Sequence, residues 1–331
     1  MATQSVSRTL RWAAPLVAVA LTTAQALGSS VALDTLGFET YNLGPLAGQQ
    51  GWLGVGGPGG AAFVQSSVVH SGTKAVQVNR GAGSDNFWAV PLGGSYPTGR
   101  FMLVDWDMNV VGTGATDGRL GPFFGVEAYD DIGIFGRLGG FGVDATTGEV
   151  LFLKSDPGGA ILSDTADETV LFNTWNHFAM LFDFTSSRYS LFLNGVRLLD
   201  TPFADPGLNQ FTDADIVAYA AAADSGSMLI PGTAYFDNFR VLNGLPGDFD
   251  QDGDVDADDL PIWKAAYGTT AAGDADGNLI TDGNDFLIWQ RNLGVDLTPA
   301  TAASGAVPEP SGALLAGLAL LAAARRAAPR R

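Results

Sequence analysis

Residues 175–198, WNHFAMLFDFTSSRYSLFLNGVRL, decide the fold class of this chain. Two runs rich in aromatic and aliphatic residues, 175–184 and 189–193, each have the length of a β-strand. Asn194 and Gly195 then join the second run to another extended segment. This dipeptide suits a two-residue type I′ turn, because both of its positions need a positive φ. The stretch therefore predicts antiparallel strands that are joined by tight turns.

The same pattern continues through residues 31–243. Residues 101–111 alternate, and the positions on one face are all apolar: Met102, Val104, Trp106, Met108 and Val110. Similar runs cover residues 150–154 and 234–242. Many of the 44 glycines lie in this region, where they favour turns over helices, and we expect helical structure only as a turn near residues 213–219. Many short strands predict a two-sheet sandwich.

The sequence Trp175-Asn-His-Phe, followed by the segment from Tyr189 to Leu198, resembles the laminin-G-like and concanavalin-like jelly rolls. In those families a W-x-H strand leads into a hairpin that contains Asn-Gly. Residues 234–241, AYFDNFRV, also look like the closing strand of such sandwiches and of carbohydrate-binding modules. The resemblance implies a jelly-roll domain over residues 31–243.

A second informative stretch, Gly247–Gly294, contains two copies of one acidic pattern offset by 26 residues. Oxygen ligands at positions 1, 3, 5, 9 and 12 of a tight loop, with a backbone carbonyl at position 7, suit calcium, which binds about six to eight oxygens. The pattern therefore predicts two calcium loops. Their ligand candidates are Asp248, Asp250, Asp252, Asp254, Asp256 and Asp259 in the first copy, and Asp274, Asp276, Asn278, Asp282 and Asp285 in the second.

The two copies differ at two positions. The first has Gly253 at the sharp turn and Val255 two residues later, where an apolar residue can pair with the neighbouring loop. The second has Leu279 and Thr281 there, so we expect a weaker or distorted second site. Each loop leads into an amphipathic segment, 260–267 and 286–293, with Ile-Trp at matching places. The alternative is an acidic, solvated linker whose spacing is accidental.

This repeat pair resembles a type I dockerin, with Asp in place of Glu at position 12 and one helix after each loop. The resemblance implies a small α-helical, EF-hand-like module at residues 247–294 that folds around calcium and docks onto a cohesin-like domain. Dockerins recognise their partner through the residues after position 9, which here are Ala257 and Asp258, and Gly283 and Asn284. These are not the Ser/Thr pairs of the well-known cellulosomal modules.

The composition excludes several classes of function. The chain of 331 residues has no cysteine, so it has neither disulfides nor a thiolate nucleophile. Its 35 acidic and 17 basic residues give a net charge of −18, which argues against nucleic-acid binding because phosphates are neutralised by clusters of Lys and Arg. The acidity favours cations and solubility.

Both ends have the character of targeting segments. Residues 1–26 combine Arg8 and Arg11 with an apolar run and an Ala-Gln-Ala site, as in a secretory signal peptide. After a linker at 295–307, residues 308–331 begin with Pro308, Glu309 and Pro310 and end in an apolar run and arginines. This tail resembles a PEP-CTERM sorting signal, which implies cleavage by a membrane exosortase. The resemblance implies a secreted bacterial protein that is released or attached at the cell surface after cleavage, with membrane contact only through the tail before processing.

The sequence favours a non-catalytic sandwich. A glycosidase needs two carboxylates facing one sugar, yet no two of the five glutamates share a strand at even spacing. Glu127 with Asp130 and Asp131 is the nearest acidic cluster, and a solvated strand end is the simpler interpretation. His70 and His177 lie in no motif for nucleophilic catalysis. We therefore expect no catalytic residues and no enzymatic activity.

Two further sites are candidates. Jelly-roll carbohydrate-binding modules often share a calcium ion between the first and last strands, and Glu39 and Asp237 occupy similar places, although both can equally be surface carboxylates. Sugars stack on exposed aromatic rings, and the candidates in loop segments rich in Gly and Pro are Trp52, Trp88 and Tyr96. Trp106 and Trp175 lie on strands, where core positions are expected.

Together these features predict a secreted, surface-sorted protein with a glycan-binding jelly roll and a calcium-dependent docking module. The alternatives are a polysaccharide hydrolase or lyase, and a structural protein of the extracellular matrix.

Overall fold

The computed structural model describes residues 30–57, 59–90, 92, 100–116, 118–131, 136–155, 161–222, 225–250, 254–276 and 280–295. All of them belong to the first of two compact units, Met1–Asp296. The expected signal peptide and the sorting tail with Pro308, Glu309 and Pro310 lie outside the described residues.

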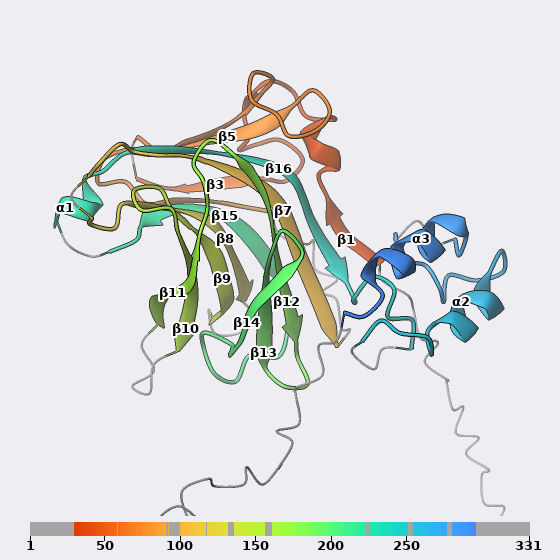
Figure 1. The fold of residues 1–331 in the computed structure, drawn as a ribbon. Helices are drawn as coiled ribbons and strands as arrows, with labels where there is room; N and C mark the ends of the chain where they lie inside the picture. Colours follow the sequence, from red (N-terminus) through yellow and green to blue (C-terminus); the bar gives the residue numbers. More distant parts are fainter. Residues whose placement is uncertain are drawn as a thin grey trace, which may run out of the picture. The chain divides into compact units, whose positions relative to one another are not determined.

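The described strands form two antiparallel sheets that pack face to face (Figure 1). The nine-stranded sheet has the order β14-β13-β12-β7-β16-β5-β4-β2, with β1 paired to β16. Its strands are β1 (Ser30–Asp34), β2 (Gly44–Pro45), β4 (Ala61–Gln65), β5 (Ala75–Arg80), β7 (Phe101–Val111), β12 (Trp175–Asp183), β13 (Arg188–Leu193), β14 (Val196–Pro202) and β16 (Gly232–Asn243).

The seven-stranded sheet has the order β11-β10-β9-β8-β15-β6-β3. Its strands are β3 (Leu53–Gly56), β6 (Asn86–Ala89), β8 (Pro122–Asp130), β9 (Gly136–Asp144), β10 (Glu149–Ser155), β11 (Ile161–Thr169) and β15 (Asp213–Ala220). The prediction of a two-sheet β-sandwich is therefore confirmed.

Aromatic residues fill the space between the sheets. Trp106 on β7 stacks on Phe178 of β12, with ring centroids 5.7 Å apart, and meets Phe141 of β9 edge-on at 6.1 Å. All three rings are at most 1% exposed. Burying one such side chain stabilises the fold by about 1.5–3 kcal/mol, so this cluster anchors one sheet to the other.

The turn and strand predictions have different outcomes. Asn194 and Gly195 both have positive φ, as the type I′ prediction requires, and β7 covers the predicted residues. The helical turn expected near residues 213–219 is wrong, because this segment is strand β15. Ala214, Ile216 and Ala218 of β15 lie in the core, and the residues between them point to the other face, which is the period of a strand.

The outer face of the seven-stranded sheet is sheltered. Every residue of β8 is buried, although only alternate ones point into the core. At the centre of this face Gly125 of β8 lies opposite Gly142 of β9, and the Phe123 side chain lies close over both. An added Cβ on Gly142 would lie 2.2 Å from the Phe124 carbonyl oxygen and 2.6 Å from the Gly125 Cα.

We therefore expect Gly142→Ala to destabilise the sandwich by about 2–3 kcal/mol, because both clashing atoms belong to the backbone and cannot rotate away. Urea unfolding of the full chain measures this difference. Gly283→Ala is the control, since nothing lies within 4 Å of its Cβ position. A Gly142→Ala variant as stable as wild type would contradict this packing.

The helical segments of the described residues are short. They are η1 (Leu36–Phe38), α1 (Ser225–Met228), α2 (Leu260–Ala266) and α3 (Gly283–Asn292). None of them is long and apolar enough to cross a membrane. Helices α2 and α3 each follow one of the acidic loops, and α3 begins three residues earlier than the amphipathic segment predicted from residue 286.

Candidate functional sites

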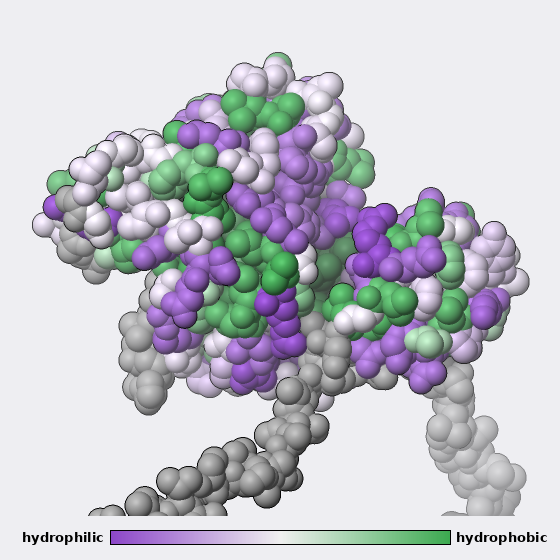
Figure 2. All heavy atoms as spheres, viewed as in Figure 1, coloured by the Kyte–Doolittle hydropathy of each residue, from purple (hydrophilic) through white to green (hydrophobic). Residues whose placement is uncertain are grey.

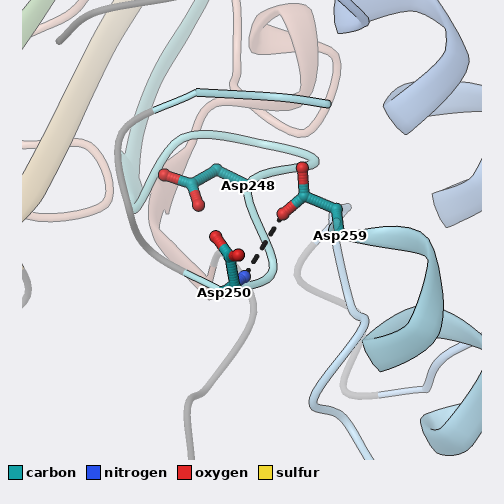
Figure 3. A group of neighbouring side chains, drawn as sticks. All are labelled: Asp248, Asp250 and Asp259. Atoms are coloured by element: carbon teal, nitrogen blue, oxygen red, sulfur yellow. Dashed lines mark hydrogen bonds between the residues drawn. The ribbon is translucent and has the colours of Figure 1, made fainter. Parts of the chain in front are cut away.

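Three carboxylates of the first acidic loop converge on one point. Asp248, Asp250 and Asp259 each place an oxygen within 4.8 Å of the others (Figure 3). Asp248 and Asp259 are only 3% and 1% exposed. Calcium binds oxygens at about 2.3–2.6 Å, so two ligands on opposite sides of the ion lie at most about 5 Å apart. The size and chemistry of this group therefore fit a calcium ion.

Asp259 also organises the loop. Its Oδ1 accepts hydrogen bonds from the backbone N–H of Phe249 at 2.6 Å and of Asp250 at 3.2 Å, and its Oδ2 accepts one from Asp256 at 2.8 Å. Burial raises the pKa of Asp259 to about 6 despite these bonds, and the neighbouring Asp250 adds to the rise. A cation at this point would remove that repulsion.

The second loop repeats these contacts 26 residues later. Asp274, Asp276 and Asp285 form the equivalent group within 4.8 Å, and Asp285 is fully buried. Asp285 accepts from the N–H of Ala275 at 2.7 Å, of Asp276 at 3.2 Å and of Asp282 at 2.7 Å. These three bonds match those that Asp259 accepts in the first loop, and the Thr281 hydroxyl also accepts from the N–H of Gly273 at 3.0 Å. A weaker second site stays a prediction.

The two halves of the segment are linked reciprocally. The Trp263 indole N–H on α2 donates to the carbonyl of Asp282, and Trp289 on α3 donates to that of Asp256, at 3.0 and 2.8 Å. The two indoles thus tie each helix to the loop of the other repeat. Val255 pairs with residues 294 and 295, not with the neighbouring loop as predicted.

The remaining loop candidates have different positions. Asp256 and Asp282 use side-chain oxygens to accept from the N–H groups of Asp258 and Asn284, at the starts of the helical segments. Asp254 is described and lies outside the three-carboxylate group, and a ligand through its carbonyl stays a prediction. Asp252 and Asn278 lie outside the described residues.

A second polar group lies on the outer face of the seven-stranded sheet. Three neighbouring strands bring it together: Glu127 of β8 lies directly opposite Asp215 of β15, and Tyr129 of β8 lies between Asp213 and Arg137 of β9. We call these five residues and Tyr219 the acid–tyrosine cluster. Glu127, Tyr129 and Asp215 are 3–4% exposed, so Glu127 is not the solvated strand end that the sequence suggested.

The charges in the acid–tyrosine cluster are uneven. Burial raises the pKa of Asp215 to about 9, and the charges of Asp213, Glu127 and Asp131 contribute, so Asp215 is protonated at neutral pH. Burial also raises the pKa of Glu127, and two contacts oppose this rise: Tyr129 donates a hydrogen bond to its carboxylate, and the Arg137 Nε lies 3.7 Å away. Burial, together with Glu127, raises the pKa of Tyr129, which stays protonated. Glu127 thus lies beside a hydrogen-bond donor and a cation, whereas Asp215 lies among other carboxyl groups.

This cluster borders an apolar floor. Phe123, Leu151 and Val217 are buried on the outer face of the sheet, with Phe87 and Tyr219 packed beside them. Within the described residues, the Asp215 Oδ1 and the Arg137 Nε have no hydrogen-bond partner. Apolar surface beside a few convergent polar groups is typical of a ligand site.

The outer face of the nine-stranded sheet carries both histidines of the chain. Asp107 on β7 lies between them, 3.0 Å from the His177 Nδ1 and 3.1 Å from the His70 Nδ1. The hydrogen bond to Asp107 raises the pKa of His177. Although burial opposes it, hydrogen bonding from His177 and Asn238 lowers the pKa of Asp107. Figure 2 shows hydrophilic residues gathered where β7 and β16 run in Figure 1.

The expected calcium ligands Glu39 and Asp237 both hold the loop at residues 70–74. Asp237 accepts from the backbone N–H of His70 and Ser71 at 3.0 and 3.1 Å. Glu39 accepts from those of Thr73 and Lys74 at 2.6 and 2.9 Å. Both carboxylates are therefore satisfied by backbone donors, and calcium binding here stays a prediction.

The predicted sugar-binding tryptophans have other positions. Trp52 is fully buried, where its indole N–H donates to the Tyr41 hydroxyl at 3.0 Å, and Trp88 is 4% exposed in the same core. Stacking of these two rings on a sugar is therefore wrong. Tyr96 lies outside the described residues. The core position expected for Trp106 is confirmed, but Trp175 is half-buried on the outer face of the nine-stranded sheet.

No protein-family model and no curated protein matches this chain. Among solved structures, it is similar to an endo-β-1,4-glucuronan lyase from the fungus Trichoderma reesei, with 13% identity, a TM-score of 0.45, and coverage of 60% of this chain and 93% of that one. The cellulose-induced protein Cip1 has 16% identity, a TM-score of 0.42, and coverage of 64% and 95%. Alginate lyase Aly36B has 10% identity, a TM-score of 0.41, and coverage of 66% and 99%.

At such low identity the similarity concerns the β-sandwich fold. Polysaccharide lyases nevertheless recur among these structures, and this finding overturns the expectation that the protein is not an enzyme.

Proposed function

We propose that the sandwich cleaves a polysaccharide by acid–base catalysis on the outer face of its seven-stranded sheet. The observation that carries this proposal is the pairing of Glu127 with Asp215 on neighbouring strands. Their environments differ, because Tyr129 and Arg137 lie beside Glu127, whereas burial and neighbouring carboxyl groups raise the pKa of Asp215 to about 9. Such a difference is the pattern of a catalytic acid and base. Phe87, which is half-buried beside the apolar floor, offers a ring to the sugars.

The protonated carboxyl of Asp215 would donate its proton to the oxygen of the glycosidic bond as that bond breaks. In hydrolysis, Glu127 would attack the sugar carbon or activate a water molecule to do so. In elimination, Glu127 would take the proton from the carbon that carries the uronic-acid carboxylate, and Arg137 would neutralise that carboxylate. The electron pair of the broken C–H bond would form a carbon–carbon double bond as the leaving oxygen departs. Tyr129 would support Glu127 through its hydrogen bond in both cases.

The test is cleavage of a panel of neutral and uronic-acid polysaccharides by the full chain. New reducing ends alone indicate hydrolysis, and near-ultraviolet absorbance of an unsaturated sugar indicates elimination. Glu127→Gln should lower the rate by about 10²–10⁴-fold. Glu168→Gln, an exposed glutamate on β11, should leave it unchanged. No cleavage of any substrate, or equal rates for Glu127→Gln and wild type, would refute the proposal.

We also propose that residues 247–294 bind two calcium ions and form a docking module. The repeated groups of three carboxylates support this proposal. A cohesin-like domain is the partner that the sequence resemblance implies. In this proposal the protein is secreted, and exosortase processing of residues 308–331 leaves it at the cell surface.

A further inference from the structure

One straight row of residues crosses the outer face of the nine-stranded sheet. The strand register places Trp175 opposite Asn109, Asn109 opposite Tyr235, Tyr235 opposite Gln77, and Gln77 opposite Phe63. Core residues lie next to four of these residues along their strands: Met108, Phe236, Val76 and Val64. On β12 the core residue is Phe178, three positions after Trp175 and therefore on the opposite face from it. All five members of the row therefore point away from the core.

The three aromatic members are evenly spaced. Trp175, Tyr235 and Phe63 lie on β12, β16 and β4, and one strand separates each from the next. Neighbouring strands are about 4.7–4.9 Å apart, so successive rings are about 9–10 Å apart. Two sugar units of an extended β-linked chain span about the same length. Phe63 is 37% exposed, and the rings of Trp175 and Tyr235 are half-buried.

Amide groups fill the intervals between the rings. Asn109 is 6% exposed, and within the described part of the chain its Oδ1 has no hydrogen-bond partner. Gln77 donates to the Asn79 Oδ1 at 3.0 Å, which leaves its own carbonyl oxygen available as an acceptor. Sugar hydroxyls between stacked rings need such partners, since they both donate and accept hydrogen bonds.

The Trp175 end of the row is held in place. The His70 ring packs against the Trp175 ring with centroids 5.4 Å apart, and Asp107 fixes His70 through the 3.1 Å contact. A ring already held in position loses little conformational entropy when a ligand stacks on it.

We propose that Trp175, Tyr235 and Phe63 form an aromatic strip that binds one extended, neutral, β-linked polysaccharide chain across the strands. The net charge of −18 disfavours a polyanion. This inference shares with the proposed function only the assumption of a polysaccharide ligand, because the acid–tyrosine cluster lies on the other sheet.

Affinity electrophoresis of the full chain in gels containing soluble hydroxyethylcellulose tests the strip. Wild type should be retarded, and Trp175→Ala and Tyr235→Ala should each bind about tenfold more weakly. Phe192→Ala is the matched control, because Phe192 lies on the outer face of β13 outside the row. Thermal unfolding separates a misfolded variant from one that has lost only binding, and Tyr235→Phe, which keeps the ring, should bind as wild type.

Retardation that is equal in wild type and both alanine variants would overturn the inference, and so would retention only by an alginate gel. Cleavage of short soluble oligosaccharides distinguishes the two proposals. The alanine variants of the strip should cleave them at the wild-type rate. Glu127→Gln should bind hydroxyethylcellulose normally and cleave the oligosaccharides about 10²–10⁴-fold more slowly. A strip that binds in a protein without activity would refute only the proposed catalysis.

Discussion

Chelation of calcium should unfold residues 247–294 and leave the β-sandwich folded. Each loop holds two carboxylates that are at most 3% exposed: Asp248 and Asp259, and Asp274 and Asp285. Buried carboxylates so close together are costly without a cation. A segment of 48 residues buries too little apolar surface to offset this cost. Each ion at about 100 times its dissociation constant would stabilise the fold by about 2.7 kcal/mol.

Calorimetric titration of the full chain should detect two calcium ions, and far-ultraviolet circular dichroism should record a gain of helix as α2 and α3 form. Asp259→Ala should remove one ion, because it deletes a ligand and three hydrogen bonds to the loop backbone. Asp258→Ala, which removes an exposed neighbouring carboxylate, should bind two. Two ions bound by Asp259→Ala would contradict the assignment of the first site.

Asp215→Asn should abolish most of the cleavage activity without destabilising the protein. As the proton donor, Asp215 should contribute about 10²–10⁴-fold to the rate. Because its pKa is raised to about 9, the wild-type rate should fall as the pH rises through that value and Asp215 ionises. Between the unfolded pKa of about 3.9 and the raised folded pKa, Asp215 holds its proton in the folded state but not in the unfolded state. The free energy of unfolding of the wild type therefore falls as the pH rises through this range. An amide does not ionise, so Asp215→Asn should be at least as stable at neutral pH.

Rates and thermal unfolding temperatures measured against pH check both expectations. Asp167→Asn on β11 is the control, because it makes the same change at an exposed carboxyl. It should alter neither the rate nor the unfolding temperature. An Asp215→Asn variant with the wild-type rate would exclude Asp215 as the acid. A variant that unfolds at a much lower temperature would instead indicate a structural, ionised carboxylate.

The sequence predicts those strands whose two faces differ in polarity. On β7, Asp105, Asp107 and Asn109 alternate with core residues, and the alternation reveals both the strand and its bounds. On β8 the pattern fails, because Phe123 and Phe124 are buried on opposite faces of the same sheet. Strand β9 is rich in glycine, and Gly125 and Gly142 have no side chain from which a period could be read.

The candidate sites also differ in how well the sequence predicts them. The calcium loops are local, so the spacing of Asp248, Asp250 and Asp259 is visible along the chain. Glu127 and Asp215 are 88 residues apart, from 215 − 127, and only the pairing of β8 with β15 makes them neighbours. Trp175 and Tyr235 likewise become members of one row only through the register of β7 with its two neighbours. A single sequence does not reveal the register between strands that are far apart in the chain.

The row of rings and the acid–tyrosine cluster lie on opposite faces of one sandwich, with the aromatic core between them. Packed sheets are about 10 Å apart, and a stiff polysaccharide chain cannot fold around so thin a layer. A protein that uses both faces must therefore hold one chain and cut another. Such an arrangement suits the interior of a fibre or gel, where it would sever cross-links between neighbouring chains while staying attached, and it gives no advantage on isolated chains in dilute solution.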